Sequence, residues 1–380
     1  MKSSLVWAEI DLKKLRNNLR LIRSRLVKSG VEILAIIKAD AYGHGMNEAA
    51  KIFYAEGVRF FGVASLEEAI TLRKTCPTAR ILVLGAFHGE QIEIYFKKNI
   101  TPTISSAEDA RGLENYLNSK NKKMKIHLKI DTGMGRFGVW HEDLESLLIE
   151  LKNQKSLEVE GVYTHFANAD HAEKARTTQQ LSHFNRALLS VKRAGIFPKY
   201  IHAANSLGIL RFKNAHFNMV RPGIILYGMN PVGGGTPPLP KGIQPILSLK
   251  TRIAFLKTVE KGRPISYGST YRTTGKTTIA TLPIGYSHGY KVGFSNKASV
   301  IIRGKRCPVI GRVTMDHTLV DVTGVPGVKR WEEVTLIGGN GGARIRAEEL
   351  AAFIQSISYE ITCSIHSRIP RVYIGQAHRP

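Results

Sequence analysis

An apolar run that ends in a lysine is the starting point for the fold. It lies within residues 31–45, which read VEILAIIKADAYGHG. The β-branched residues from Ile33 to Ile37 favour a strand, and Lys38 ends the apolar run. A short apolar run closed by a charged residue is typical of a fully buried strand. The stretch therefore predicts a buried strand with Lys38 at its carboxyl end.

Runs of the same kind recur along the chain as far as about residue 228. The other seven are Phe60 to Ala64, Ile81 to Leu84, Pro102 to Ile104, Ile126 to Ile130, Val159 to Thr164, Tyr200 to Ala203 and Met219 to Leu226. Amphipathic segments long enough for crossover helices lie between most of them, such as Ser65 to Lys74, Ala107 to Asn118, Glu142 to Lys152 and Thr177 to Ala194. This alternation predicts a (β/α)8 TIM barrel, and a doubly wound open sheet is the alternative that periodicity does not exclude.

The composition changes after the eighth run. Glycine and proline gather between Gly228 and Pro245, which indicates a connection. Residues 245–376 then hold short apolar runs with closely spaced turns, and only Ala347 to Ile357 predicts a helix. We expect a barrel domain at residues 1–240 and a mainly antiparallel β domain at residues 241–380. Residues 1–11 form a segment that can pack on the β domain.

Composition restricts the class of protein. The chain has 380 residues, of which 43% are hydrophobic, so a disordered chain is excluded. No run approaches the roughly 18 apolar residues of a membrane helix. Three cysteines without metal-ligand spacing predict neither a disulfide framework nor a metal site, and we expect a cytoplasmic protein.

The net charge of +25 raises the question of nucleic-acid binding. The basic residues near the amino terminus, however, surround an apolar stripe with helical spacing, formed by Leu12, Leu15, Leu19, Ile22 and Leu26. Such residues are typical of the solvated face of a helix. We therefore expect no functional nucleic-acid partner and no membrane partner.

Lys38 is a candidate for chemistry because of its position. The carboxyl ends of barrel strands are where such folds place their active sites. Desolvation there lowers the pKa of a lysine from about 10.4 towards neutrality, which makes the amine a usable nucleophile or base. An ordinary surface lysine is the alternative, because a residue at the end of a strand can also point into water.

The segment from Lys38 to Gly45, KADAYGHG, resembles the cofactor-binding motif of alanine racemases, which use pyridoxal 5'-phosphate. The resemblance continues in family order through Asp131 to Arg136, Ser266 to Gly268, Ile284 to Tyr286 and Thr314 to Asp316. It implies a barrel followed by a β domain, in agreement with the pattern analysis. It also implies an isomerase that interconverts L- and D-alanine, supplies D-alanine for peptidoglycan, and works as a homodimer with shared active sites.

Racemisation requires that one proton leaves one face of Cα and another arrives at the opposite face, so two acid/base groups must flank it. The resemblance implies that these groups are Lys38, which binds the cofactor aldehyde, and Tyr267. A tyrosine has a pKa near 10, so positive charge or hydrogen-bond donors must acidify it. A buried tyrosine with a satisfied hydroxyl is the alternative for Tyr267.

The resemblance assigns further residues to the site. The implied cofactor-binding residues are Lys38, Tyr42, His165, Asn205, Ser206, Arg221, Gly223 and Ile224. The implied substrate-binding residues are Arg136 and Met315, supported by Lys129, His202, Asp316 and Tyr286. In this family the arginine that corresponds to Arg221 faces the pyridine nitrogen. The lysine that corresponds to Lys129 is carbamylated in many members.

One departure from the family pattern concerns substrate size. Ser367 stands where some members have a tyrosine that contacts the phosphate and narrows the entrance. The smaller side chain makes a broader-specificity racemase an alternative, with serine as the first substrate to test. A decarboxylase of the same architecture and a non-catalytic carrier of the cofactor are two more. Tyr267 argues against the decarboxylase, and the second domain argues against the carrier.

Overall fold

The chain folds into two compact units, neither of which is continuous in sequence. The computed structural model describes residues 4–171, 173–232 and 238–375. The first unit, here called the β unit, comprises Met1–Asn18, Tyr42–Gly45 and Tyr227–Pro380, and the second, the barrel unit, comprises Leu19–Ala41 and Met46–Leu226. Gly233 to Pro237, in the predicted connection, lie outside the described residues.

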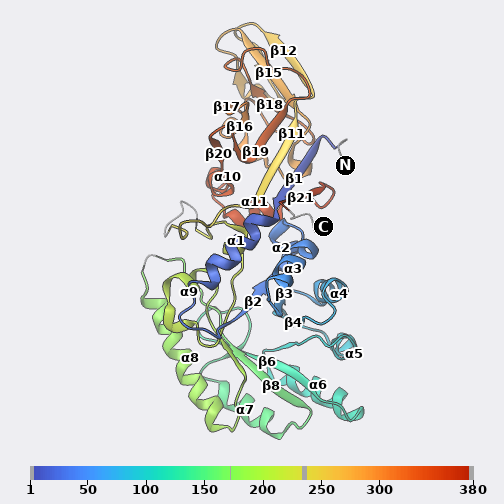
Figure 1. The fold of residues 1–380 in the computed structure, drawn as a ribbon, viewed down its shortest axis with the longest axis vertical. Helices are drawn as coiled ribbons and strands as arrows, with labels where there is room; N and C mark the ends of the chain where they lie inside the picture. Colours follow the sequence, from blue (N-terminus) through green and yellow to red (C-terminus); the bar gives the residue numbers. More distant parts are fainter. Residues whose placement is uncertain (1–3, 172, 233–237, 376–380) are drawn as a thin grey trace. The chain divides into compact units, whose positions relative to one another are not determined.

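Eight parallel strands form the barrel unit (Figure 1). They are β2 (Glu32–Ile36), β3 (Phe60–Val63), β4 (Arg80–Val83), β5 (Thr103–Ile104), β6 (Met124–Asp131), β8 (Leu157–Tyr163), β9 (Tyr200–His202) and β10 (Met219–Val220), in the order β4-β3-β2-β10-β9-β8-β6-β5. A parallel bridge between Leu82 and Thr101 joins the two ends of this order. There Val83 N donates to Thr101 O at 3.0 Å and Thr101 N donates to Ile81 O at 2.8 Å. The predicted barrel is confirmed, and the open sheet is excluded.

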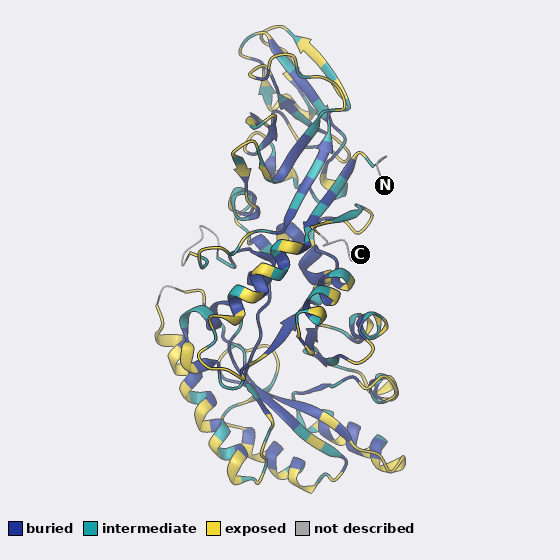
Figure 2. Ribbon diagram, in the orientation of Figure 1, coloured by how far each residue is buried: buried dark blue, intermediate teal, exposed yellow. Residues whose placement is uncertain are grey.

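Helices follow the strands and cover the outside of the barrel (Figure 1). They include α3 (Met46–Ala55), α4 (Leu66–Thr75), α5 (Ile92–Lys97), α6 (Ala107–Ser119), α7 (Leu144–Asn153), α8 (Ala175–Arg193) and α9 (Ser206–Arg211). Ser65 and Ser106 begin α4 and α6 as N-caps, and each hydroxyl accepts a hydrogen bond from the backbone amide three residues later. The long helices bury one face and expose the other, whereas the strands are buried (Figure 2). The four predicted crossover helices are therefore confirmed.

The eighth strand is shorter than predicted. We expected a strand from Met219 to Leu226, but β10 ends at Val220 and Ile224–Tyr227 forms a 3₁₀ turn. Pro222 explains the difference, because it has no amide hydrogen for the ladder, although its carbonyl still accepts from Ile36 N at 3.0 Å. The regular strand therefore ends at Val220, although Arg221 and Pro222 each still form one backbone hydrogen bond to a neighbouring segment of the barrel.

The β unit is mainly antiparallel, as predicted (Figure 1). Its largest sheet has the order β17-β16-β19-β11-β1-β21, formed by β17 (Lys305–Pro308), β16 (Ser299–Ile302), β19 (Glu333–Asn340), β11 (Leu247–Arg252), β1 (Val6–Asp11) and β21 (Arg371–Ile374). A second sheet consists of β12 (Phe255–Val259), β15 (Thr277–Leu282) and β18 (Thr318–Asp321). β1 pairs antiparallel with β11 and parallel with β21, so the first strand of the chain lies inside this sheet.

Two helices of the β unit replace the single predicted one. α10 (Ala347–Phe353) falls within the predicted segment, whereas α11 (Ser358–Cys363) was not predicted. Gln355, with a φ of +52°, separates the two helices, and this left-handed residue ends the helical pattern. None of the helices in the described parts of the chain is long and apolar enough to cross a membrane.

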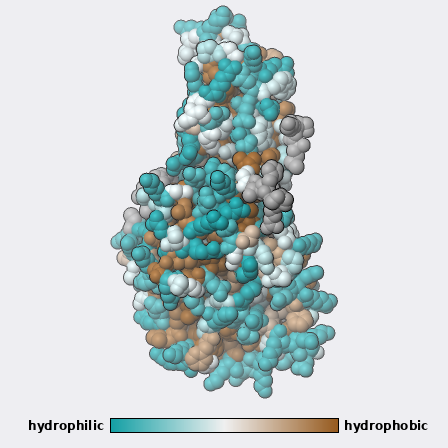
Figure 3. Space-filling model, viewed as in Figure 1, coloured by the Kyte–Doolittle hydropathy of each residue, from teal (hydrophilic) through white to brown (hydrophobic). Residues whose placement is uncertain are grey.

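α1 (Leu12–Arg23) has the amphipathic arrangement that the sequence predicts, with an apolar stripe on one side and basic residues on the other. Leu12, Leu15, Leu19 and Ile22 are all buried, whereas Leu26 lies beyond the end of the helix. Hydrophilic side chains cover most of the face of the molecule that Figure 3 shows, with apolar atoms visible between them. The helix therefore presents its charges on the side away from its buried stripe, as the spacing predicts.

A left-handed turn follows the first barrel strand directly. α2 (Lys38–Gly43) has φ angles of +51°, +52°, +54° and +56° at Ala39, Asp40, Ala41 and Tyr42. Left-handed helical geometry costs about 1–2 kcal/mol for each residue that carries a Cβ. Strain of this kind persists only where the surroundings hold it, and it gathers at functional sites.

Hydrogen bonds from several elements hold this turn. In the barrel unit, the Glu68 carboxylate accepts from Ala39 N at 2.6 Å, and the Asp40 carboxylate accepts from Met46 N at 2.7 Å. In the β unit, Arg371 donates two hydrogen bonds to Gly43 O, at 3.1 and 3.2 Å. The chain around α2 therefore stabilises a conformation that its own residues disfavour.

Gly43 provides a test of how tightly the turn is held. Its φ is +83°, and a Cβ there would lie 2.2 Å from Thr362 O. We expect Gly43→Ala to lower the free energy of unfolding by about 3 kcal/mol or more, because the clash adds to the backbone strain. Gly262→Ala is the matched control, since Gly262 has a φ of +84° with open space around it, and its cost should be about 1 kcal/mol. Equal losses in urea denaturation would contradict a tightly held turn.

Candidate active site

The carboxyl ends of the barrel strands carry most of the predicted site residues. Lys38 follows β2, Lys129 lies near the end of β6, and His165 follows β8. Asn205 and Ser206 follow β9, and Arg221, Gly223 and Ile224 follow β10. This end of a parallel barrel is where active sites are built. Arg136 and His202 also belong to the barrel unit, whereas the other predicted residues lie in the β unit: Tyr42, Tyr267, Tyr286, Met315 and Asp316.

Arg221 is a buried cation in this barrel mouth, with 3% of its surface exposed. Nη1 donates to the His202 carbonyl at 2.8 Å, and Nη2 donates to the carbonyls of Thr164 and Ala203 at 2.6 and 3.1 Å. Burial lowers the pKa of the guanidinium to about 10, so the group stays protonated at neutral pH. The carbonyl groups at the ends of β8 and β9 therefore fix the position of a permanent positive charge.

His165 is held in one protonation state by this arginine. Its Nδ1 lies 3.3 Å from Nη2 of Arg221. A guanidinium can only donate, so Nδ1 accepts and the ring proton lies on Nε2. Burial and then the charge of Arg221 lower the pKa of His165 well below its usual value. The ring is therefore neutral and offers a single N–H donor.

Ser206 and Gly223 join the ends of the last two strands. The Asn205 side chain caps α9 by accepting from Gly208 N at 2.9 Å. The Ser206 hydroxyl accepts from Gly223 N at 3.0 Å, and Ile224 is completely buried. Asn205 is therefore the helix cap, and the Ser206 hydroxyl retains a proton to donate.

Asp131 folds the loop that carries Arg136. Its carboxylate accepts hydrogen bonds from the backbone amides of Gly133 and Met134, both at 2.8 Å, and of Arg136 at 3.0 Å. The Thr132 hydroxyl lies 2.7 Å from that of Thr164 at the end of β8. The loop is thus built around one carboxylate, which leaves the Arg136 side chain to extend from it.

Lys129 is a buried amine with an unusual pKa. Its residue is 4% exposed, and its Nζ lies above the rings of Phe137 and Tyr163, 5.5 and 5.6 Å from their centroids. Burial, and then the charges of Arg136 and Arg221, lower the pKa of Lys129 to about 8. A substantial fraction of this side chain is therefore neutral in mildly alkaline solution.

Tyr267 is presented to solvent on the β unit. It begins a 3₁₀ turn, Tyr267–Ser269, and 71% of the residue is exposed. The φ angles of Ser266 and Ser269 are +63° and +48°, and the Ser266 hydroxyl donates to Arg312 O at 2.6 Å. The alternative of a buried structural tyrosine is therefore wrong.

Tyr286, Met315 and Asp316 lie on two turns that are bonded to each other. Tyr286 N donates to Thr314 O and Ser287 N donates to Met315 O, both at 3.0 Å. The Asp316 carboxylate accepts from the Ser287 hydroxyl at 2.9 Å. Tyr286 and Met315 are 44% and 54% exposed. The β unit thus presents large apolar side chains on neighbouring loops.

Comparisons with known proteins agree with this architecture. The family model "Alanine racemase, N-terminal domain" matches residues 10–231, and "Alanine racemase, C-terminal domain" matches residues 246–373. The alanine racemase of Carboxydothermus hydrogenoformans is 43% identical over 369 residues, which cover 97% of this chain and 99% of that protein. The chain belongs to the alanine racemase family. Its reaction is the interconversion of L- and D-alanine, so it is an isomerase.

Solved structures of alanine racemases superpose on almost the whole chain. That of the Bacillus anthracis enzyme with bound L-Ala-P has a TM-score of 0.91 and 39% identity, and covers 99% of this chain and 97% of its own. That of the Bartonella henselae enzyme, described with covalently bound pyridoxal phosphate, has a TM-score of 0.88 and 29% identity, with 98% and 100% covered. Both units of the chain are therefore those of an alanine racemase.

The barrel mouth of this alanine racemase is strongly positive. The cations of Lys38, Arg136 and Arg221 lower the pKa of Lys129, and the same three lower that of His165. Asp131 opposes them in the case of Lys129, but its oxygens already accept three backbone hydrogen bonds. Excess positive charge in a partly closed mouth favours anionic ligands, and the substrate of a racemase carries a carboxylate.

Sequence reasoning missed two aromatic residues of this site. Tyr163 stacks on His202 with ring centroids 4.7 Å apart, and its ring centroid lies 5.2 Å from Cζ of Arg221. His127 lies 2.9 Å from His202 and is completely buried. The sequence does indicate these positions, because His127 and Lys129 are two residues apart in β6 and therefore lie on the same face of the strand.

The low pKa of Lys129 predicts a reaction with carbon dioxide. The neutral amine attacks the carbon atom, an N–C bond forms as one C=O π bond opens, and one proton leaves to solvent. The product is the anionic carbamate that the family resemblance implies for this lysine. Adduct formation should rise as the pH increases through about 8, because the neutral fraction rises there. Lys129→Arg should remove the carbamate signal in ¹³C NMR of the racemase with labelled bicarbonate.

Lys125→Arg is the matched control for this reaction. Lys125 lies on the same strand, but hydrogen bonding and charge from Glu160 raise the pKa of its amine. The signal should therefore survive the control substitution. A carbamate signal that persists in the Lys129→Arg protein would contradict the assignment.

Proposed function

We propose that the chain racemises alanine with pyridoxal 5'-phosphate bound in the barrel mouth, and that Lys38 and Tyr267 are its two proton-transfer groups. The observation that carries this proposal is the joint placement of an amine, a buried arginine and an imidazole at the carboxyl ends of three barrel strands. Lys38 follows β2 on a strained turn, Arg221 is fixed by carbonyl groups, and His165 is held neutral. This combination suits an anionic aldehyde cofactor with a ring nitrogen.

The residues of the barrel mouth fit each chemical part of that cofactor. The Lys38 amine suits an aldehyde. The Ser206 hydroxyl, which Gly223 N orients by donating to it, suits a phosphate together with the Ile224 amide. Arg221 supplies a donor for a pyridine nitrogen. The likeness to the Bartonella henselae racemase, described with covalently bound pyridoxal phosphate, supports the same choice.

Pyridoxal phosphate, when bound, supplies an electron-withdrawing system that weakens the Cα–H bond of the amino acid. Arg221 stays protonated, so it donates to the ring nitrogen and keeps that nitrogen without a proton. Selectivity follows, because a weaker electron sink favours proton return to Cα over side reactions. Arg136 is proposed to bind the substrate carboxylate, for which a planar guanidinium offers two parallel donors.

The second base is proposed to be Tyr267, helped by His165. Lys38 removes or returns a proton on one face of Cα, and the phenol does so on the other. A phenol needs donors or positive charge to act as a base near neutral pH. His165 has an Nε2–H donor available because its Nδ1 already accepts from Arg221. A hydrogen bond from that N–H would stabilise the phenolate of Tyr267.

We propose a homodimer in which Tyr267 of the partner subunit completes the site around Lys38. The exposure of three large side chains on the β unit supports a covering surface, since Tyr267, Tyr286 and Met315 are 71%, 44% and 54% exposed. Exposed large apolar side chains on neighbouring loops, as for Tyr286 and Met315, are typical of a surface that a partner covers. Met315 and Asp316 are proposed to line the substrate side of the same site, with Tyr42 and His202 on the cofactor side.

The proposed role in the cell is supply of D-alanine for peptidoglycan, in the cytoplasm. The small number of cysteines supports that location. Serine is proposed as a second substrate, because Ser367 is exposed and small where some family members have a tyrosine.

Deuterium incorporation tests the two-base mechanism. In deuterated water, L-alanine should give both enantiomers with deuterium at Cα, and L-serine should do so more slowly. Tyr267→Phe should keep the absorbance of the bound cofactor but slow exchange of one enantiomer about 10²- to 10⁴-fold more than the other. Lys38→Ala should lose that absorbance. Loss of carbon dioxide would indicate the decarboxylase, no exchange would indicate the carrier, and symmetric slowing would contradict two separate bases.

Mixed dimers test the shared site. If Lys38 of one subunit works with Tyr267 of the other, a Lys38→Ala subunit paired with a Tyr267→Phe subunit keeps one intact site of two. Random refolding of the two inactive variants should then restore about a quarter of the native activity, since about half of the dimers are mixed. No activity in the mixture would show that each site is built within one subunit, and full activity of a monomer would exclude the dimer altogether.

A further inference from the structure

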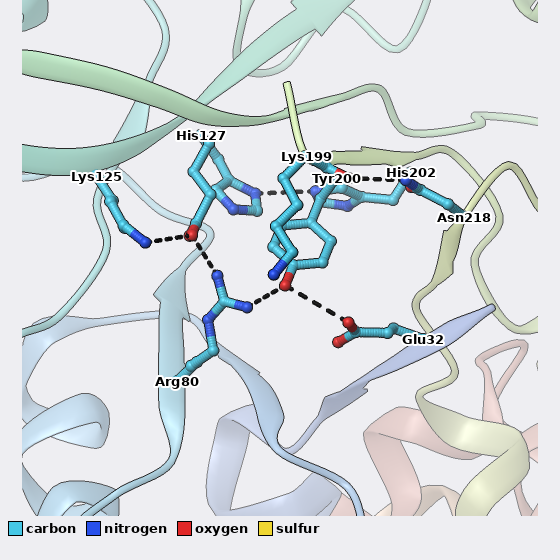
Figure 4. Close-up of polar contacts among 9 residues, drawn as sticks. Glu32, Arg80, Lys125, His127, Lys199, Tyr200, His202 and Asn218 are labelled. Atoms are coloured by element: carbon cyan, nitrogen blue, oxygen red, sulfur yellow. Dashed lines mark hydrogen bonds and ion pairs between the residues drawn. The ribbon is translucent and has the colours of Figure 1, made fainter. Parts of the chain in front are cut away.

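Two buried histidines connect the interior of the barrel to Arg221. His127 lies in β6 and His202 in β9, and the strand between them is β8. The rings meet inside the barrel, with His127 Nδ1 and His202 Nε2 2.9 Å apart (Figure 4). Both residues are completely buried. The pair therefore links the lower part of the barrel interior to the active-site arginine.

The hydrogen bonds determine where each ring proton lies. Arg221 Nη1 lies 2.8 Å from His202 Nδ1, and a guanidinium has no lone pair to offer. His202 Nδ1 must therefore accept, which places the proton on Nε2. That N–H in turn faces His127 Nδ1, so this atom accepts as well. The His127 proton then lies on Nε2, which is buried and has no hydrogen-bond partner among the described residues, a cost that the donor chain from Arg221 imposes. One direction of donation thus runs from Arg221 through His202 to His127.

The surroundings keep both rings neutral. Burial, and then the charge of Arg80, lowers the pKa of His127 to about 3. Burial and Arg221 lower the pKa of His202 well below its usual value. Arg80 lies in a polar cluster shown in Figure 4, where it forms an ion pair with Glu160 and donates to the Tyr200 hydroxyl. A second proton on either histidine is therefore disfavoured by burial and by nearby positive charge.

Packing fixes the His127 ring against the strand between the two histidines. A Cβ on Gly161 of β8 would lie only 2.3 to 2.6 Å from three atoms of the His127 ring, so only glycine leaves room for it. Phe60 meets the ring edge to face at 5.5 Å, and Tyr200 stacks at 6.2 Å. On the other side Tyr163 stacks on His202 at 4.7 Å. The two imidazoles are thus held by ring contacts as well as by their hydrogen bond.

We propose that His127 is a positioning residue for the racemase reaction. His127 accepts the Nε2–H of His202 and so keeps the Nδ1 lone pair of His202 directed towards Arg221. This contact fixes the orientation of the arginine, which is proposed to face the cofactor ring. The proposal rests on the proposed function for the role of Arg221, but the tautomers themselves are a property of this chain. Nothing in the reaction requires His127 to touch substrate or cofactor.

Loss of the acceptor would disturb the arginine through His202. A buried N–H without a partner is unfavourable, so the His202 ring would turn or move its proton to Nδ1. Either change sets an N–H donor against the N–H groups of Arg221. The guanidinium would then lose one of its fixed contacts and orient less well towards a ring nitrogen.

Nitrogen NMR of the native protein tests the tautomers directly. With ¹⁵N-labelled histidine, both His127 and His202 should show a protonated Nε2 and an unprotonated Nδ1, with or without added pyridoxal phosphate. A protonated Nδ1 on either ring, or a doubly protonated ring near neutral pH, would overturn the proposal. This result does not depend on racemase activity, whereas failure of the deuterium experiment with native His127 would overturn only the proposed function.

Two substitutions separate positioning from stability. His127→Leu removes the acceptor and should shift the His202 signals and lower kcat about tenfold or more with the KM for alanine little changed, which is the scale of losing a partner that orients an active-site group. His127→Asn offers an amide oxygen near the same place and should recover most of both losses.

A third substitution controls for general destabilisation. His216 is another buried histidine of the barrel unit, and its Nε2 lies 2.9 Å from Ile209 O. His216→Asn should lower stability without moving the His202 signals or kcat. If His127→Leu leaves both the His202 signals and kcat unchanged, or if His216→Asn changes them equally, His127 has no positioning role. Should the leucine variant fail to fold, Gly161→Ala displaces the same ring and takes its place.

Discussion

The buried guanidinium of Arg221 is the interaction on which the site depends. A cation with 3% exposure is tolerated only where fixed acceptors replace water, and here the carbonyls of Thr164, His202 and Ala203 do so. These carbonyls are available because the neighbouring strands β8 and β9 end at the same level of the barrel. The guanidinium then determines the protonation of both histidines beside it. One buried charge thus organises three strand ends and two imidazoles.

The turn after β2 shows how the fold places a reactive amine. Lys38 stands between a buried strand and four residues of left-handed geometry, which cost about 1–2 kcal/mol each. The Glu68 carboxylate and the Arg371 guanidinium hold that conformation from outside, and the carboxylate of Asp40 holds it from within the turn. Strain held by surrounding contacts gives the amine a defined direction, which a flexible loop would not provide.

The sequence predicted the fold from periodicity and most of the site from resemblance. Eight apolar runs and four long amphipathic segments were sufficient for a barrel, because strand and helix periods differ clearly. The eighth predicted strand was too long at its carboxyl end. Pro222 lacks the amide hydrogen that a strand ladder needs, and a pattern of hydrophobic residues does not show this. α11 was missed because six residues carry too little periodicity. The left-handed turn could not be predicted, because Ala39 and Ala41 do not favour it and distant residues impose it.

The placement of β1 has a consequence for how the chain folds during synthesis. Ala8 to Asp11 pair with Arg371 to Ile374, and their other edge pairs with β11. At about 5–20 residues per second, the first strand waits roughly 20 to 70 seconds for its last neighbour to leave the ribosome. During that interval the edge of β1 that pairs with β21 lacks its partner. Most barrel strands, in contrast, pair with strands that are close to them in sequence. Nascent chains of this enzyme are therefore most exposed to mispairing and to chaperone capture at their first strand.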